Sequence, residues 1–94
     1  MNITLKTFAT IRDVVGAATL SIELPTGARL SDLFAHLTHT YGKNFDRQVR
    51  DQLTGAYVPF LILVNTTPYR STHDIETPLH DGDVVTIMVP FDGG

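Results

Sequence analysis

Residues 30–41 read Leu-Ser-Asp-Leu-Phe-Ala-His-Leu-Thr-His-Thr-Tyr, and the predicted fold is built around this segment. Its apolar residues recur at the three- and four-residue intervals of an α-helix, and they are Leu30, Leu33, Phe34, Leu37 and Tyr41. The spacing predicts one amphipathic helix that begins near Ser31 or Asp32 and is stopped by Gly42. Segments on either side of this helix have to cover its single apolar face.

Two strands are predicted before this helix. Residues 3–8 alternate between apolar and polar side chains, and residues 19–24 place Leu20, Ile22 and Leu24 on one side. Between them, residues 11–15 form a short helical turn that Gly16 ends. We expect the two strands to pair as an antiparallel ribbon.

The segment after the main helix predicts a second, shorter helix and then a strand. Asn44 is a candidate cap for the helix, whose apolar residues repeat at four-residue intervals, namely Phe45, Val49 and Leu53. Residues 60–64 are all apolar, which is typical of a strand that is covered on both faces. We therefore expect them at the centre of the sheet.

The last third of the chain predicts a short edge strand and a final strand. Tyr69-Arg70 is the candidate edge, and Leu79 is expected to anchor a turn-rich segment to the core. Asp81-Gly82-Asp83 predicts a tight turn into residues 84–89, where Val85, Ile87 and Val89 share one face.

This element order predicts an α+β fold. A mixed sheet of four to five strands would wrap around one main helix, with a short second helix beside it. This is the β-grasp arrangement of ubiquitin-like domains. We expect residues 1–90 to form that domain and residues 91–94 to be a flexible C-terminal diglycine tail.

Composition narrows the classes of function. The 94 residues suit one domain, and the absence of cysteine excludes disulfides and thiolate metal sites. A formal charge of −3 argues against nucleic-acid binding. The sequence shows neither a signal-peptide pattern nor an apolar run of membrane-spanning length, so we expect a soluble, cytoplasmic protein.

The charges are unevenly distributed along the chain. All seven Lys and Arg residues lie at or before Arg70, whereas acidic residues continue to Asp92. This predicts a negative field around the C-terminus, suited to a basic partner surface. A solvated acidic face that only maintains solubility explains the pattern equally well.

The chain ends in Gly93-Gly94. Glycine has no Cβ, so a diglycine can enter a narrow site and bring its terminal carboxylate to a partner's reactive group. We predict Gly94 as the modified residue and Gly93 as the residue that gives clearance. The alternative is a frayed terminus that contains two glycines by chance.

Other candidate sites are weaker. Phe91 either docks on a partner or folds back onto its own core. His36 and His39 have a zinc-compatible spacing, but they lie on the polar side of the helix without a third ligand, so we expect a solvated pair. Asp81-Gly82-Asp83 lacks the remaining ligands of a calcium loop, and no serine has the surroundings of a nucleophile.

The sequence resembles the ThiS and MoaD family of sulfur carriers, among which molybdopterin synthase small subunits are the most similar. Four segments carry the likeness in the family's order: residues 8–16, 24–33, 62–65 and 77–94. They include Leu24-Pro25-Thr26-Gly27, Ile62-Leu63-Val64-Asn65 and the terminal diglycine. Residues 42–59 form a longer segment than in the smallest members, and the approach to the diglycine differs from the usual one at Met88, Val89 and Phe91.

The resemblance implies a carrier that is not itself an enzyme and binds no cofactor. A ubiquitin-activating-like enzyme would use ATP and Mg²⁺ to adenylate Gly94, and a sulfurtransferase or other persulfide donor would then yield a thiocarboxylate. In the molybdopterin branch, the tail enters the synthase large subunit and donates sulfur for the dithiolene of the molybdenum cofactor. Pro90, Phe91, Asp92 and Gly93 would contact the partner.

Three alternatives stay open at this stage. The same thiocarboxylate could serve thiamine, cysteine or tRNA thiolation. A ubiquitin-like modifier would instead join Gly94 to a target lysine by an isopeptide bond. In a β-grasp interaction module, the glycines would be incidental.

Overall fold

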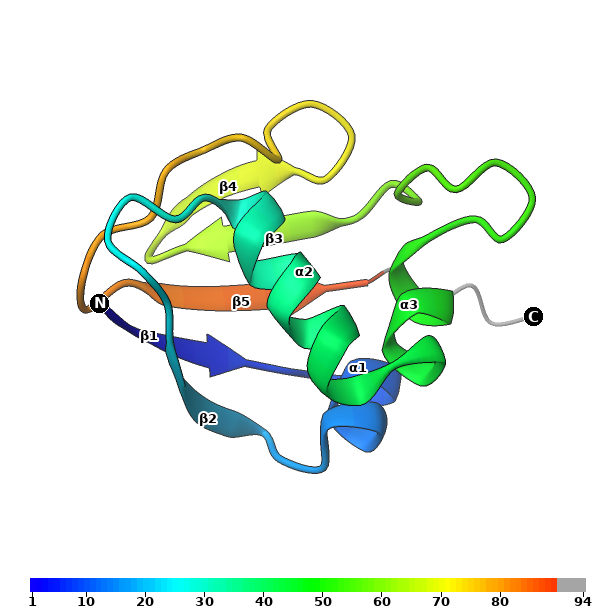
Figure 1. Ribbon diagram of the computed structural model, residues 1–94, viewed down its shortest axis with the longest axis horizontal. Helices are drawn as coiled ribbons and strands as arrows, with labels where there is room; N and C mark the ends of the chain where they lie inside the picture. The colour runs from blue at the N-terminus through cyan, green and yellow to red at the C-terminus, as the bar shows by residue number, and fades with distance from the viewer. Residues whose placement is uncertain (90–94) are drawn as a thin grey trace.

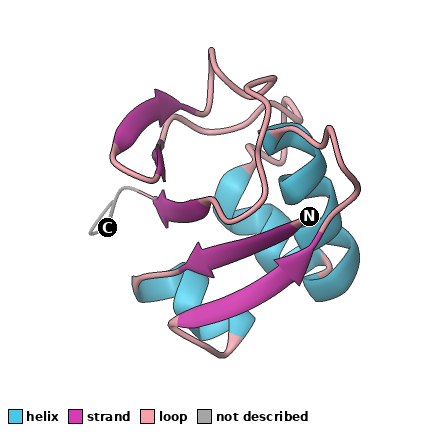
Figure 2. Cartoon of the chain, turned by 90° about the vertical axis from the view of Figure 1, so that its left-hand side faces the viewer, coloured by secondary structure: helices cyan, strands magenta, loops and turns pink. Residues whose placement is uncertain are grey.

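A computed structural model describes residues 1–89 of the chain. The elements follow in the order β1 (Asn2–Lys6), α1 (Ala9–Val15), β2 (Thr19–Glu23), α2 (Leu30–Tyr41), α3 (Lys43–Val49), β3 (Leu61–Val64), β4 (Thr67–Arg70) and β5 (Val84–Met88) (Figure 1). The predicted β-grasp fold is confirmed, since the five strands form one mixed sheet and α2 crosses one of its faces. Figure 2 shows the twist of that sheet.

The strand order in the sheet is β2-β1-β5-β3-β4. The predicted antiparallel ribbon of β1 and β2 is confirmed, and β3 pairs antiparallel with both β4 and β5. β1 and β5 pair in parallel, with Leu5 opposite Val85. The last strand therefore inserts between the two hairpins and occupies the centre of the sheet.

The prediction that residues 60–64 form the central strand, covered on both faces, is wrong. β3 lies second from one edge, and its side chains alternate between buried Ile62 and Val64 and the outward Leu61, which is 45% exposed. The helix α2 covers only one face of the sheet, so a wholly apolar strand here still has one open side. An apolar run alone does not encode the position of a strand in its sheet.

The core lies between α2 and the covered face of the sheet. Leu30, Leu33, Phe34 and Leu37 of α2 are all fully buried, as their spacing predicts. Phe34 is the centre of an aromatic cluster, with ring centroids 6.3 Å from Phe45, 5.6 Å from Tyr57 and 5.6 Å from Phe60. Leu79 is 2% exposed, which confirms it as a core anchor.

The start of α2 differs by one residue from the prediction. The helix begins at Leu30, and the side chain of Asp32 accepts a hydrogen bond of 2.8 Å from the backbone N–H of Arg29. Asp32 therefore caps the helix from within its first turn. The loop before β5 also covers this turn, because the N–H groups of Leu30 and Ser31 donate to the carbonyls of Thr77 and Ile75.

The second helix is shorter than predicted. α3 begins at Lys43 and ends at Val49, so Phe45 and Val49 are buried as expected, but Leu53 is 96% exposed. Arg50 has extended backbone angles, and the carboxylate of Asp51 accepts hydrogen bonds from the N–H groups that follow, which replaces the next helical turn by a side-chain-stabilised turn. The Asp51 turn therefore leaves the Leu53 side chain exposed to solvent. Burying a leucine side chain would contribute about 1.5–3 kcal/mol to the free energy of folding.

Arg50 holds this turn against the core. Its guanidinium lies 4.3 Å from the centroid of the Tyr57 ring, donates to the Tyr57 hydroxyl at 3.0 Å, and forms an ion pair with Asp46 at 3.0 Å. Burial raises the pKa of the Tyr57 hydroxyl above its usual value of 10.0, and the positive charge of Arg50 opposes that increase.

Replacing Phe34 by alanine should destabilise the protein by about 3–5 kcal/mol, because it empties the centre of the aromatic cluster. Urea unfolding followed by circular dichroism measures this change. Leu53→Ala is the matched control and should change the free energy of unfolding by less than about 0.5 kcal/mol, since its side chain is exposed. Equal effects of the two substitutions would contradict the assigned core.

The pKa of Tyr57 predicts a dependence of stability on high pH. Because the folded state raises that pKa, the neutral phenol contributes stability that is present below about pH 10 and is lost as the pH rises through the folded-state pKa. Tyr57→Phe removes this contribution. The free energy of unfolding should therefore fall less steeply above about pH 10 in the variant than in the wild type. Identical slopes in urea titrations across that range would show that the phenol is not shielded in the fold.

Candidate functional site

The predicted site residues Pro90, Phe91, Asp92, Gly93 and Gly94 lie outside the described residues. The roles of these five residues therefore stay predictions. Both interpretations of Phe91 and the predicted boundary between domain and tail also stay predictions. The structure describes the surface that precedes them, at the end of β5.

The end of β5 shares one edge of the domain with the end of β1. The two strands run parallel with Lys6 opposite Thr86, so both finish on the same side of the molecule (Figure 1). Val89, which follows β5, is partly buried and packs against the core. The last described residue is thus held by the sheet and its core.

Apolar side chains are exposed at this end of the sheet. Three of the four large exposed hydrophobic residues in the described range occur here, and we call them the exit patch: Phe8 is 54% exposed, Leu61 45% and Met88 45%. Leu61 and Met88 are register partners on adjacent strands, on the face that α2 does not cover. Phe8 follows β1 by two residues, which places it at the same end. Gathered apolar exposure of this kind marks contact surfaces on soluble domains.

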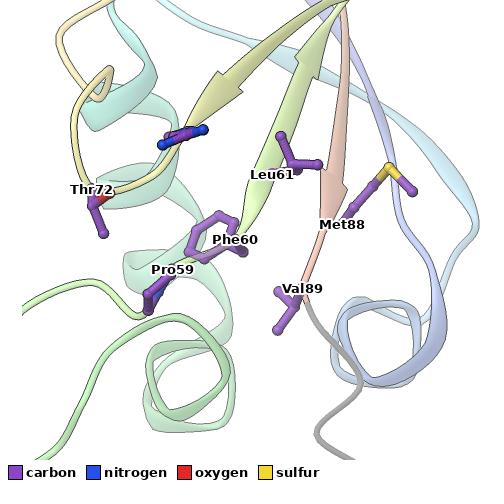
Figure 3. Close-up of a pocket in the computed structure, with 7 residues that line it drawn as sticks. Pro59, Phe60, Leu61, Thr72, Met88 and Val89 are labelled. Atoms are coloured by element: carbon purple, nitrogen blue, oxygen red, sulfur yellow. The ribbon is translucent and has the colours of Figure 1, made fainter.

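A surface pocket of about 630 Å³ lies beside the exit patch. Figure 3 shows Pro59, Phe60 and Leu61 at the start of β3 on one side and Met88 and Val89 on the other. Its lining is mainly apolar, with Arg70 and Thr72 as the polar residues.

Ser71 fixes one wall of this pocket. Its buried hydroxyl accepts a hydrogen bond of 2.9 Å from the N–H of Phe60 and donates one of 2.7 Å to the carbonyl of Val58. The N–H of Ser71 donates in turn to the carbonyl of Phe60. The segment that leads into β3 is therefore tied to the end of β4.

The expected negative field around the C-terminal segment stays a prediction, because Asp92 lies outside the described residues. Asp81 and Asp83 precede β5 and so lie at the opposite end of the sheet from Val89. Arg70 is the charged residue that lines the pocket beside Val89, and it is the register partner of Leu61. Asp74 lies beside Arg70, because its carboxylate accepts a hydrogen bond of 2.7 Å from the backbone N–H of Arg70.

The Asp81-Gly82-Asp83 segment, considered above as part of a calcium loop, forms a turn. The predicted turn at residues 81–83 is confirmed, since Gly82 has φ of 85° and the Asp81 and Asp83 carboxylates accept hydrogen bonds from the backbone N–H groups of Asn2 and His80. Within residues 1–89, no group of three or more His, Cys, Asp or Glu side chains is placed so that it could hold a metal ion. In the same range, every helix is too short or too polar to span a membrane.

Sequence reasoning missed the exit patch. Residues 60–64 are uniformly apolar, so the sequence does not distinguish the buried Ile62 from the exposed Leu61. Met88 offered a usable signal, because it falls on the opposite side of its strand from Val85 and Ile87. A domain with one layer of helices must leave that side open.

Comparisons with known proteins assign the chain to a family. The family model described as the ThiS family matches residues 5–94. A putative molybdopterin converting factor, subunit 1, from Pyrococcus furiosus is 30% identical, with 96% of this chain and 98% of that chain covered and a TM-score of 0.73. No curated protein sequence matches significantly.

Two further solved structures show the same fold. SAMP1 from Haloferax volcanii has a TM-score of 0.80 at 19% identity, with 100% of both chains covered. A complex of subunits 1 and 2 of the molybdopterin-converting factor from Helicobacter pylori contains a chain with a TM-score of 0.60 at 22% identity, again with 100% of both chains covered. Together with the family match over residues 5–94, the fold shows that the chain belongs to the ThiS family, which shares the architecture of ubiquitin-like sulfur carriers and modifiers.

Proposed function

We propose that the protein is a sulfur carrier, activated at Gly94, that serves as the small subunit of molybdopterin synthase. The observation that carries the choice of pathway is the 30% identity, over 96% of this chain, to the Pyrococcus furiosus protein named as a putative subunit 1 of a molybdopterin converting factor. Membership of the ThiS family supports the carrier chemistry itself.

The proposed chemistry begins at the terminal carboxylate. Its reference pKa of about 3.3–3.7 leaves it ionised and a poor electrophile at neutral pH. On an adenylating partner that binds ATP and Mg²⁺, a carboxylate oxygen attacks the α-phosphorus and pyrophosphate leaves. A persulfide sulfur then displaces AMP, and a thiol cleaves the resulting acyl disulfide to release the thiocarboxylate. The partners supply every catalytic group, and the carrier supplies the reacting carboxylate.

The exit patch supports docking at the end of the sheet that precedes the tail. Residues 90–94, if fully extended, span at most about 18 Å, so a partner that acts on Gly94 has to approach this end closely. Leu61 and Met88 then become part of its footprint. Apolar and aromatic side chains are the usual energetic centres of such contacts. We extend this docking to the synthase large subunit, for which the Helicobacter pylori complex of subunits 1 and 2 provides a structural parallel.

Deleting Gly94 should abolish thiocarboxylate formation by the adenylating enzyme and persulfide donor of the same organism. Intact-mass spectrometry detects the product as the replacement of one oxygen by sulfur. Thr66→Ser, at the exposed turn between β3 and β4, is the control and should react like the wild type. Undiminished product from the shortened chain would refute the assignment of Gly94.

Met88→Asp should weaken binding to the large subunit about tenfold or more, because it places an unpaired carboxylate in the exit patch. Isothermal titration calorimetry measures the affinity. Thr66→Asp adds the same charge at the other end of β3 and should leave the affinity close to that of the wild type. Equal affinities for the two variants would remove the exit patch from the interface.

Reconstitution tests the receiver of the sulfur. The thiocarboxylated protein, mixed with the large subunit and the cyclic pyranopterin precursor, should yield the dithiolene product. Thiolation of thiamine precursors, cysteine precursors or tRNA in its place would retain the carrier chemistry and assign it to another pathway.

A further inference from the structure

The pocket beside the exit patch lies where the pairing of β3 with β5 stops. The last register pair is Leu61 and Met88, and the next residues along, Phe60 and Val89, form opposite walls of the pocket (Figure 3). Phe60 is bonded on its other side, since its carbonyl accepts from the N–H of Ser71 at 3.0 Å and its N–H donates to the Ser71 hydroxyl at 2.9 Å. The described chain therefore ends in the wall of a pocket.

Two prolines explain why the pairing stops there. Successive residues of a strand with a neighbour on each side direct their backbone groups alternately to the two neighbours. Phe60 bonds toward β4, so Leu61 and Pro59 are the residues whose backbone groups face β5. Continued register would set Pro59 opposite Pro90, and neither residue has an N–H to donate. The next hydrogen-bonded pair cannot form, which accounts for the opening between the strands.

Residues 90–94 lie outside the described residues, but their sequence and their point of departure suit this pocket. Val89 lines the pocket, and Phe91 comes two residues later, at most about 7 Å further along the chain. Pro90 restricts Val89 to extended conformations, and side chains two positions apart in an extended chain lie on the same side. The mainly apolar lining that Val89 faces is therefore also within reach of an aromatic ring at position 91.

Charge favours the same occupant. Arg70 lines the pocket, and none of the ion pairs within residues 1–89 involves its guanidinium. Asp74 binds the backbone N–H of Arg70 and is not among the described residues that line the pocket. Residues 90–94 contain the negative side chain of Asp92 and no Lys or Arg. A carboxylate that follows the aromatic ring directly is the natural partner of a guanidinium at the pocket wall.

We propose that this pocket is an intramolecular docking site for residues 90–94, with the Phe91 ring in its apolar part and the Asp92 carboxylate paired with Arg70. The site belongs to the free chain and goes beyond the proposed function. In that function, a partner has to draw the segment out of the pocket before it acts on Gly94. The apparent dissociation constant of such a partner rises in inverse proportion to the fraction of chains whose segment is undocked.

Nuclear Overhauser effects in the full, unmodified chain test the docking. Cross-peaks are expected between the ring protons of Phe91 and side-chain protons of Pro59, Phe60 and Thr72, which line the pocket and are distant from Phe91 in sequence. A sample that mixes isotope-labelled and unlabelled chains separates contacts within one chain from contacts between two copies. Absence of cross-peaks to all three residues would overturn the inference, and so would cross-peaks that arise only between copies.

Arg70→Gln tests the charged part of the site. The intensities of the Phe91 cross-peaks should fall about twofold, the size expected for one partly exposed ion pair. The contact between the rings of Phe34 and Phe60, whose centroids are 5.6 Å apart in the core, calibrates the intensities. Lys6→Gln removes an exposed positive charge at the end of β1, outside the pocket lining, and should leave the cross-peaks unchanged.

Equal cross-peak intensities in Arg70→Gln and Lys6→Gln would overturn the pairing of Asp92 with Arg70. Neither result bears on thiocarboxylate formation, which the deletion of Gly94 tests separately. Failure of the docking and failure of the proposed function are therefore distinguishable.

Discussion

The parallel pairing of β1 with β5 holds the two halves of the sheet together. The β1–β2 and β3–β4 hairpins are joined, within the described sheet, by β5 alone, which pairs with β1 on one side and β3 on the other. Its inward residues Val85 and Ile87 are fully buried under α2. β5 completes the core and also leads to the C-terminal segment. The pairing that closes the sheet therefore also determines where that segment begins.

That placement explains the asymmetry of the domain. Turn chemistry gathers at the start of β5, where Asp81 and Asp83 bind backbone N–H groups, whereas apolar exposure gathers at its finish, where Met88 lies beside Leu61. One end closes the fold, and the other leads to the C-terminal segment, which in the proposed function is the part that reaches a partner enzyme.

Much of the fold follows from periodicity, because α2, β1 and β2 each have one buried and one more exposed face. The predictions were wrong where one pattern of apolar residues is compatible with two different structures. Residues 60–64 are apolar on both faces, so the sequence hid the exposure of Leu61 and placed the strand at the centre. Leu53 continued a helical repeat that the Asp51 turn interrupts. The diglycine is visible in the sequence, but the exit patch could be identified only from the register of β3 and β5.

In the proposed function, the Gly94 carboxylate is the group that carries sulfur. Intact-mass spectrometry of the protein isolated from its own cells, without exposure to reductant or alkylating reagent, tests it most directly. We expect a population whose mass corresponds to one oxygen replaced by sulfur, located at Gly94 by fragmentation. Higher-mass conjugates that vanish when Gly94 is removed, with no thiocarboxylate, would contradict it and identify a protein modifier.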